Sequence, residues 1–163
     1  MRSKRLDDFL ASGKMLLVLD RVTDPGNIGT MLRTADAAGV GGLLLLQGCA
    51  DIYAPKTVRA SMGSLFHLPV LSGLSEELLV QAARKAGYEL LVTCLDGADN
   101  LYKADLKGRL AFVMGNEANG VSPALLAAAD KRVFIPMQGR AESLNVAMAA
   151  GIVMFEALRQ KLK

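Results

Sequence analysis

The sequence predicts an α/β fold with a mostly parallel sheet flanked by helices. Short continuous apolar runs of strand length recur along the chain, and stretches of helical period separate them. Gly, Pro, Asn and Ser mark the boundaries between the two kinds of segment. This alternation is typical of βαβ units, and 163 residues fit one domain with a single sizeable core.

The apolar runs define the expected strands. They lie at residues 15–19, 43–46, 66–71, 89–94, 109–114 and 132–135. The first two runs are wholly apolar, which indicates strands buried on both faces. Pro69 lies inside the third run, and because proline removes a ladder donor we expect that strand at a sheet edge or irregular.

Capping residues define the expected helices. Asn27 is expected to cap a helix over residues 28–38, with Gly39 just beyond its end. The later helix starts are expected at Pro55, at Ser75 (ending at Gly87), at Ser122 with Pro123, and at Ser143. The last helix carries one apolar stripe, formed by Leu144, Met148, Ile152, Phe155 and Leu158.

Two polar loops stand out in the last third of the chain, at residues 115–120 and 138–143. Each follows an apolar strand and leads toward a helix, and packing alone does not require so much Gly, Asn, Glu and Arg. Open α/β sheets bind ligands at the carboxyl ends of their strands. These loops therefore predict a ligand site.

Composition excludes several classes of protein. Hydrophobic content is 52%, which excludes wholesale disorder, and no apolar run reaches the length of a membrane span. The basic start of the chain is no secretory signal, so we expect a cytoplasmic protein. Net charge is +3, which is compatible with RNA contact, and the candidate phosphate contacts are Arg2, Lys4, Arg5, Arg159, Lys161 and Lys163. Aromatic content of 5% disfavours a base-stacking platform.

Metal and thiol chemistry are not expected. Cys49 and Cys94 lie beside apolar runs and are interpreted as buried free thiols. His67 is the one histidine, and a structural or edge position suits it better than catalysis. Without a Cys/His cluster, a zinc site is not predicted.

The first candidate motif runs from Asn27 through Gly29 to Arg33 and follows the first strand. A capped helix with a surface arginine would explain it, but Gly26 and Gly29 suggest that a partner approaches the backbone closely. The segment is not G-x-G-x-x-G, and the second strand ends in Gln47 rather than an acidic residue. With no Walker lysine motif either, nicotinamide cofactors and P-loop NTPases are disfavoured.

Two more motifs occupy the polar loops. Glu117 lies in a glycine-flanked loop, either as a turn carboxylate or as a group that orients an arginine or a ribose hydroxyl. Residues 135–137, followed by residues 142–147, place apolar side chains beside exposed backbone polar groups, which can hold a flat heterocycle. Capping would explain Ser143 but not Asn145, an amide with poor helix propensity at an expected helix interior.

Together the three motifs closely resemble those of the SpoU/TrmH RNA 2′-O-ribose methyltransferases, over about residues 16–158. Residues 59–63 and 66–70 look like the rRNA-modifying branch. The resemblance implies a SPOUT fold with a C-terminal deep trefoil knot, where general topology rules alone predict an unknotted sheet. It also implies an S-adenosyl-L-methionine pocket, whose expected residues are Thr93, Leu95, Gly115, Ile135, Met137, Leu144 and Asn145.

The resemblance further implies a homodimer whose active site is completed across the interface, an RNA substrate (rRNA first, tRNA second) and no metal. The implied catalytic or substrate-orienting residues are Asn27, Arg33, Glu117, Ser143 and Asn145. A guanidinium holds its proton in almost all protein settings, so we expect Arg33 to stabilise the developing alkoxide rather than to act as the base. Asn27 and Glu117 are expected to orient Arg33.

The expected domains are an N-terminal arm or linker remnant at residues 1–14 and the catalytic domain at residues 15–163. Relatives in the rRNA-modifying branch usually carry an RNA-binding domain before the catalytic one, so the chain is either a catalytic fragment or recognises RNA without that module. Two other functions stay open. One is a non-catalytic RNA-binding or assembly protein that retains the fold, and the other is a small-molecule methyltransferase.

Overall fold

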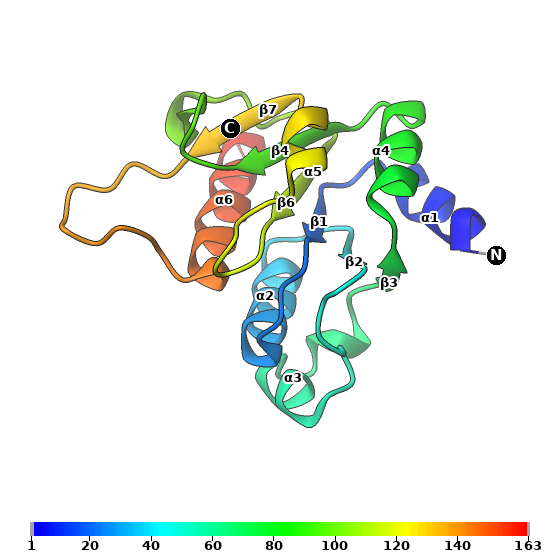
Figure 1. Cartoon of the computed structure of the whole chain (residues 1–163). Helices are drawn as coiled ribbons and strands as arrows, with labels where there is room; N and C mark the ends of the chain where they lie inside the picture. Colours follow the sequence, from blue (N-terminus) through cyan, green and yellow to red (C-terminus); the bar gives the residue numbers. More distant parts are fainter. Residues whose placement is uncertain (1, 163) are drawn as a thin grey trace.

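The computed structural model describes residues 2–162 and has a seven-stranded sheet at its centre (Figure 1). The strands are β1 (Leu16–Leu19), β2 (Gly42–Leu46), β3 (Val70–Leu74), β4 (Glu89–Thr93), β5 (Asp99–Asn100), β6 (Leu110–Met114) and β7 (Lys131–Phe134). Their order is β3-β2-β1-β6-β4-β7-β5, and every neighbouring pair is parallel. The predicted α/β class with a parallel sheet is confirmed.

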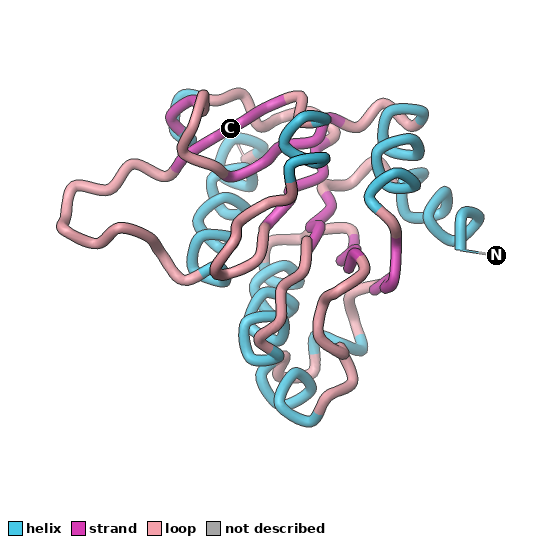
Figure 2. The backbone as a smooth tube through the Cα atoms, viewed as in Figure 1, coloured by secondary structure: helices cyan, strands magenta, loops and turns pink. Residues whose placement is uncertain are grey.

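Helices cover both faces of this sheet (Figure 2). They are α1 (Arg2–Ala11), α2 (Pro25–Ala37), α3 (Pro55–Ala60), α4 (Glu76–Lys85), α5 (Pro123–Ala128) and α6 (Val146–Lys161), with short 3-10 turns at Ser64–Phe66 and Leu101–Lys103. One buried cluster joins α2 and α6 to alternate strand residues such as Leu17 and Phe112. The other cluster joins α1, α4 and α5 to the intervening residues of the same strands, such as Val18 and Val113, which point to the opposite face. Because side chains alternate across a strand, a continuous apolar run supplies both clusters.

The expected strands all form, and apart from β3 their boundaries lie within one residue of the expected ones. β3 begins at Val70, after Pro69, so the proline precedes the strand instead of interrupting it. Its place at the sheet edge is confirmed. The extra strand β5 has two residues and pairs with β7 inside what was expected to be a loop.

Two of the expected helix starts are wrong. Asp24, not Asn27, caps α2, and its carboxylate accepts the backbone N–H of Asn27. Asn145, not Ser143, caps α6, and its Oδ1 accepts the N–H groups of Ala147 and Met148. Both stretches contain several polar residues that can cap, so the sequence alone leaves the choice open. The caps at Ser75 and Ser122 are confirmed.

The close approach expected near Gly26 and Gly29 comes from α3 of the same chain. A Cβ on Gly29 would lie 2.5 Å from the Cβ of Ala60 and 2.6 Å from the carbonyl oxygen of Thr57. A Cβ on Gly26 would meet Lys56 Cε at 3.0 Å. These glycines therefore allow two helices to pack, and they give no evidence of a ligand.

Residues 2–11 form α1, and its Leu6 and Leu10 are buried against the sheet. The expected arm is thus packed onto the fold, and a domain boundary at residue 14 stays a prediction. The side chains of Arg2, Lys4 and Arg5 and all of Lys163 lie outside the described part of the structure. Both cysteines are free and half-buried, and the exposed His67 lies 3.5 Å from the carboxylate of Asp36.

Candidate functional site

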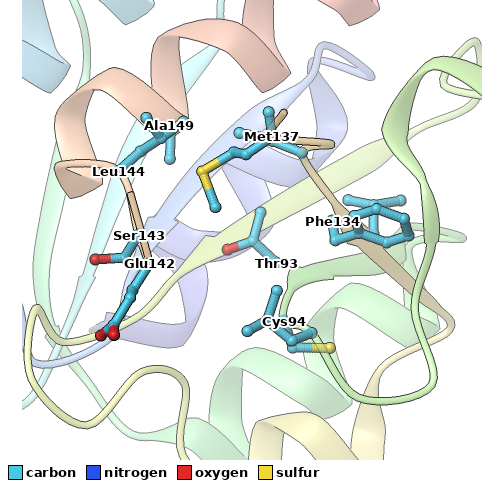
Figure 3. Close-up of a pocket in the computed structure, with 11 residues that line it drawn as sticks. Thr93, Cys94, Phe134, Met137, Glu142, Ser143, Leu144 and Ala149 are labelled. Atoms are coloured by element: carbon cyan, nitrogen blue, oxygen red, sulfur yellow. The ribbon is translucent and has the colours of Figure 1, made fainter. Parts of the chain in front are cut away.

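A hollow of about 460 Å³ lies at the carboxyl ends of β4 and β6. Its walls are the loop after β6 and the start of α6, and a smaller hollow of about 180 Å³ adjoins it toward β7 (Figure 3). Thr93, Leu95, Ser143, Leu144 and Ala149 line both, so the two form one continuous site. Its position matches the expectation that ligands bind at the carboxyl ends of parallel strands.

The fold brings together every residue expected to hold a cofactor. Thr93 and Leu95 come from the end of β4, and Gly115 follows β6. Ile135 and Met137 follow β7, and Leu144 and Asn145 precede α6. These residues lie far apart along the chain, and all of them line one of the two adjoining hollows. Their assignment to a cofactor stays a prediction at this point.

A chain of hydrogen bonds joins the three sequence motifs. Asn145 Nδ2 donates to Asn27 Oδ1 at 3.0 Å, and Asn27 Nδ2 donates to Glu117 Oε1 at 3.3 Å. Asn145 therefore has two roles, because the opposite side of its amide caps α6. The capping role explains an asparagine that the sequence alone left unexplained.

Glu117 also binds the loop between β1 and α2. Its carboxylate accepts the backbone N–H groups of Thr23 and Asp24 at 3.3 and 3.2 Å. Desolvation alone would raise the pKa of Glu117, but hydrogen bonds from its own backbone, from Asn27, from Asp24 and from Thr23 outweigh it and lower the pKa. The carboxylate is thus held in its charged form at the rim of the hollow.

Arg33 lies apart from this group. It is exposed on α2, it lines neither hollow, and its side chain makes no hydrogen bond or ion pair within the described part of the chain, residues 2–162. In the single chain Asn27 Nδ2 donates to Glu117 Oε1, and the expectation that these two residues orient Arg33 stays a prediction. Ser143 is exposed and lines the hollow, beside Leu144 (Figure 3).

Two charged residues near the site were not singled out from the sequence. Asp20, directly after β1, is fully buried and accepts the N–H of Ser122 at 2.7 Å. Arg21 binds the same carboxylate through Nε at 2.9 Å, and its carbonyl accepts Asn116 Nδ2 at 2.7 Å. The available signal was a charged pair immediately after a wholly apolar strand, where a parallel sheet places its ligand-binding edge.

The described residues offer no metal cluster and no membrane-spanning helix. Residues 2–162 contain no group of three His, Cys, Asp or Glu side chains placed to hold a metal ion. Among the helices of that range, none has the length and apolar character needed to cross a membrane.

The chain resembles known proteins over most of its length. It is 39% identical over 149 residues to the 23S rRNA (guanosine(2553)-2'-O)-methyltransferase RlmP of Bacillus subtilis, which covers 91% of this chain and 60% of that protein. It is 40% identical over 161 residues to the 23S rRNA (uridine(2479)-2'-O)-methyltransferase of Streptomyces viridochromogenes, covering 96% and 54%. The crystal structure of AdoMet-bound rRNA methyltransferase from Sinorhizobium meliloti superposes with a TM-score of 0.88 and 41% identity, covering 93% of this chain and 58% of that one.

The chain thus spans between about half and two thirds of the length of these relatives. The family itself is matched over nearly the whole chain, because residues 14–155 fit the SpoU rRNA Methylase family. The match contains β1 to β7, both hollows and the three hydrogen-bonded motifs. This chain belongs to the SpoU rRNA Methylase family.

Proposed function

We propose that this protein transfers a methyl group from S-adenosyl-L-methionine to a ribose 2′-hydroxyl of RNA, with ribosomal RNA as the first substrate and tRNA as the second. One observation carries the proposal: the three motifs that mark the family meet around one hollow and are joined by the hydrogen bonds of Asn145, Asn27 and Glu117. Two of the relatives above are named as 23S rRNA 2'-O-methyltransferases, which supports the choice of substrate.

The lining residues fit the proposed cofactor. The larger hollow, about 460 Å³, is within the usual range for small-molecule sites. Leu95, Met137 and Leu144 present exposed apolar surface that a flat purine would cover. Asn116 and Glu117 supply polar groups at the other side, and the Glu117 carboxylate favours a positively charged sulfonium. When bound, S-adenosylmethionine supplies the methyl group on that sulfonium.

The residues of the chain would bind and orient the sugar. Asn27, Glu117 and Asn145 hold one another in fixed positions, so they present their free lone pairs and N–H groups in a preorganised array. Ser143 adds a hydroxyl at the wall of the hollow. The ribose 2′-oxygen would attack the sulfonium methyl, so the O–C bond forms as the S–C bond breaks, S-adenosylhomocysteine leaves and the hydroxyl proton passes to water. The oxygen develops negative charge as it loses that proton, and Arg33 is the cation suited to stabilise it.

We propose that Arg33 acts on the hollow of a second copy of the chain, in a homodimer. Three observations support this: Arg33 does not line the hollow, it is exposed, and its side chain has no bonding partner within residues 2–162. Met148 and Phe155, on the outer side of α6, are 61% and 46% exposed and offer apolar surface for the contact. A symmetric pairing would give each site one Arg33 from the other subunit.

The test combines two variants. Arg33→Ala should bind S-adenosylmethionine normally in calorimetry but lose transfer of labelled methyl to unmodified ribosomal RNA. Leu95→Arg should fold normally, because Leu95 is 72% exposed, but should repel the cationic cofactor. A mixed dimer contains one Arg33→Ala subunit and one Leu95→Arg subunit and is purified through two different tags. It should recover about half of the wild-type activity, because the intact hollow of the first subunit receives Arg33 from the second. No recovery would place Arg33 in its own subunit's site.

Other outcomes of the same assays would favour other functions. Cofactor binding with methyl transfer to small molecules but to no RNA would indicate a small-molecule methyltransferase. RNA binding without cofactor binding would indicate a non-catalytic RNA-binding or assembly protein. Transfer to tRNA alone would leave the reaction in place and change the substrate.

We further propose that the segment before α6 threads the C-terminal trefoil knot implied by the family resemblance. Supporting this, residues 135–145 leave β7 in an extended loop and return to α6, which packs beside α2 in the same buried cluster (Figure 1). The division of the chain at residue 14 and a cytoplasmic location stay predictions.

A further inference from the structure

We propose that Asp20 and Arg21 are positioning residues that hold the β6–α5 loop, residues 115–122, in the shape that binds the cofactor. Neither residue lines the hollow, so they would act through the loop rather than on the ligand. The inference rests on the proposed function, because it assigns them to the same site. Three observations support it.

The first observation is the buried carboxylate of Asp20, which bonds the end of the loop. Asp20 is fully buried at the carboxyl end of a central strand, where an ionised group is costly unless it is well paired. Its Oδ1 accepts Arg21 Nε at 2.9 Å, and its Oδ2 accepts Arg21 Nη2 at 3.1 Å and the N–H of Ser122 at 2.7 Å. The last bond ties the end of the loop to β1.

The second observation is the number of bonds that Arg21 makes to the same loop. Its carbonyl accepts Asn116 Nδ2 at 2.7 Å, and its Nη2 lies 3.4 Å from the carbonyl oxygen of Gly120. With Ser122, the pair therefore reaches the start, the turn and the end of the loop. Gly115, Asn116, Glu117, Gly120 and Val121 of this loop form one wall of the larger hollow.

The third observation is strain. Arg21 has a backbone φ of 53°, in the left-handed region that residues other than glycine rarely adopt. In this conformation the Arg21 guanidinium bonds the carboxylate of Asp20, the residue before it, and the Arg21 carbonyl accepts Asn116 Nδ2. Such strain persists only where surrounding contacts maintain it, and it often lies at functional sites. The aliphatic part of Arg21 also packs near Gly48, where a Cβ would lie 3.1 Å from Arg21 Cγ.

The chain contains a matched control for removal of this arginine. Arg159 forks onto the buried carboxylate of Glu156 at 2.8 and 2.7 Å, on α6 and away from the loop. Removing either arginine leaves its carboxylate with another donor, Ser122 N–H for Asp20 and Gln160 Nε2 for Glu156. Arg21→Ala and Arg159→Ala therefore remove comparable ion pairs, and only the first pair binds the loop.

The experiment measures the Kd for S-adenosylmethionine by calorimetry, with thermal melting alongside. Arg21→Ala should weaken binding about tenfold, as expected when charged hydrogen bonds that order a site are lost, and Arg159→Ala should leave the Kd unchanged. Hydrogen exchange gives a second readout, because the amides of Asn116 and Gly120 bond to each other's carbonyls and should exchange faster only in Arg21→Ala. If Arg21→Ala does not fold, Arg21→Lys, which loses the fork but keeps the charge, takes its place.

Equal cofactor affinity in Arg21→Ala and the wild type would overturn the proposal, as would an equal loss in both arginine variants. If the wild type itself does not bind S-adenosylmethionine, the proposed function fails instead. In that case unchanged exchange at Asn116 and Gly120 would also refute the loop-positioning role.

Discussion

Replacing Gly115 by alanine tests the geometry of the candidate site most directly. Gly115 follows β6 and forms part of the floor of the larger hollow. A Cβ added there would lie 2.2 Å from the carbonyl carbon of Gly120 and 2.2 Å from the nitrogen of Val121. These are backbone atoms across the loop, so no side-chain rotation can relieve the overlap.

The overlap sets the size of the expected effect. Non-bonded carbon atoms rest about 3.5 Å or more apart, so the far side of the loop must retreat by roughly 1 Å. The Asn116 and Gly120 backbones bond each other at 3.0 and 2.9 Å, and a shift of that size takes both bonds beyond ordinary hydrogen-bond length. Overpacking of this kind costs about 1–3 kcal/mol of folding free energy. Since the same wall contacts the cofactor in our proposal, its Kd should rise at least about tenfold.

Calorimetry with S-adenosylmethionine and thermal melting measure the two effects. Gly139→Ala is the control, because a Cβ there meets nothing within 4 Å, and its stability should change by less than about 0.5 kcal/mol. Gly120→Ala separates backbone strain from overlap, since Gly120 has φ of 66° with open space around its Cβ and should lose about 1–2 kcal/mol. Wild-type melting and affinity in Gly115→Ala would refute the reasoning.

Two further predictions concern the hydrogen-bonded motifs. Asn145→Asp keeps the oxygen that caps α6 but loses the N–H donated to Asn27. The melting temperature should therefore stay near that of the wild type, while the rate of methyl transfer falls. A parallel loss of stability and of transfer would contradict separate roles for the two ends of the amide. Glu117→Gln should be less stable than the wild type in urea at pH 7. A carboxyl whose folded pKa is lowered contributes stability above its unfolded pKa, and this contribution is lost as the pH falls through the folded pKa. The difference in stability between Glu117→Gln and the wild type should therefore shrink below about pH 4.5. A difference that grows there would mean that the pKa of Glu117 is raised and not lowered.

Local rules were enough to predict most of the sheet. The wholly apolar runs at β1 and β2 predicted strands buried on both faces, and both are buried along their whole length. The strand next to Pro69 was correctly predicted to lie at the sheet edge, although Pro69 itself precedes β3. Ser75 and Ser122 were correctly assigned as caps because each hydroxyl reaches an N–H three residues ahead.

The same rules failed where polar residues compete for one role. Asp24 and Asn27 can both cap a helix. Asp24 takes that role, and its own backbone N–H donates to the carboxylate of Glu117, 93 residues away. Ser143 and Asn145 compete in the same way, and Asn145 is also bonded to Asn27. Long-range bonds of this kind have no signature in local spacing.

The sequence by itself determined the fold class, the strands and the motif residues that identify the family, because apolar period, cap chemistry and motif spacing are local properties. Only the tertiary structure decided which polar groups meet. The bonds from Asn27 to Glu117, from Asn145 to Asn27 and from Ser122 to Asp20 join residues 90, 118 and 102 positions apart. They form because parallel strands bring their carboxyl ends to one edge of the sheet, where loops distant in sequence become neighbours.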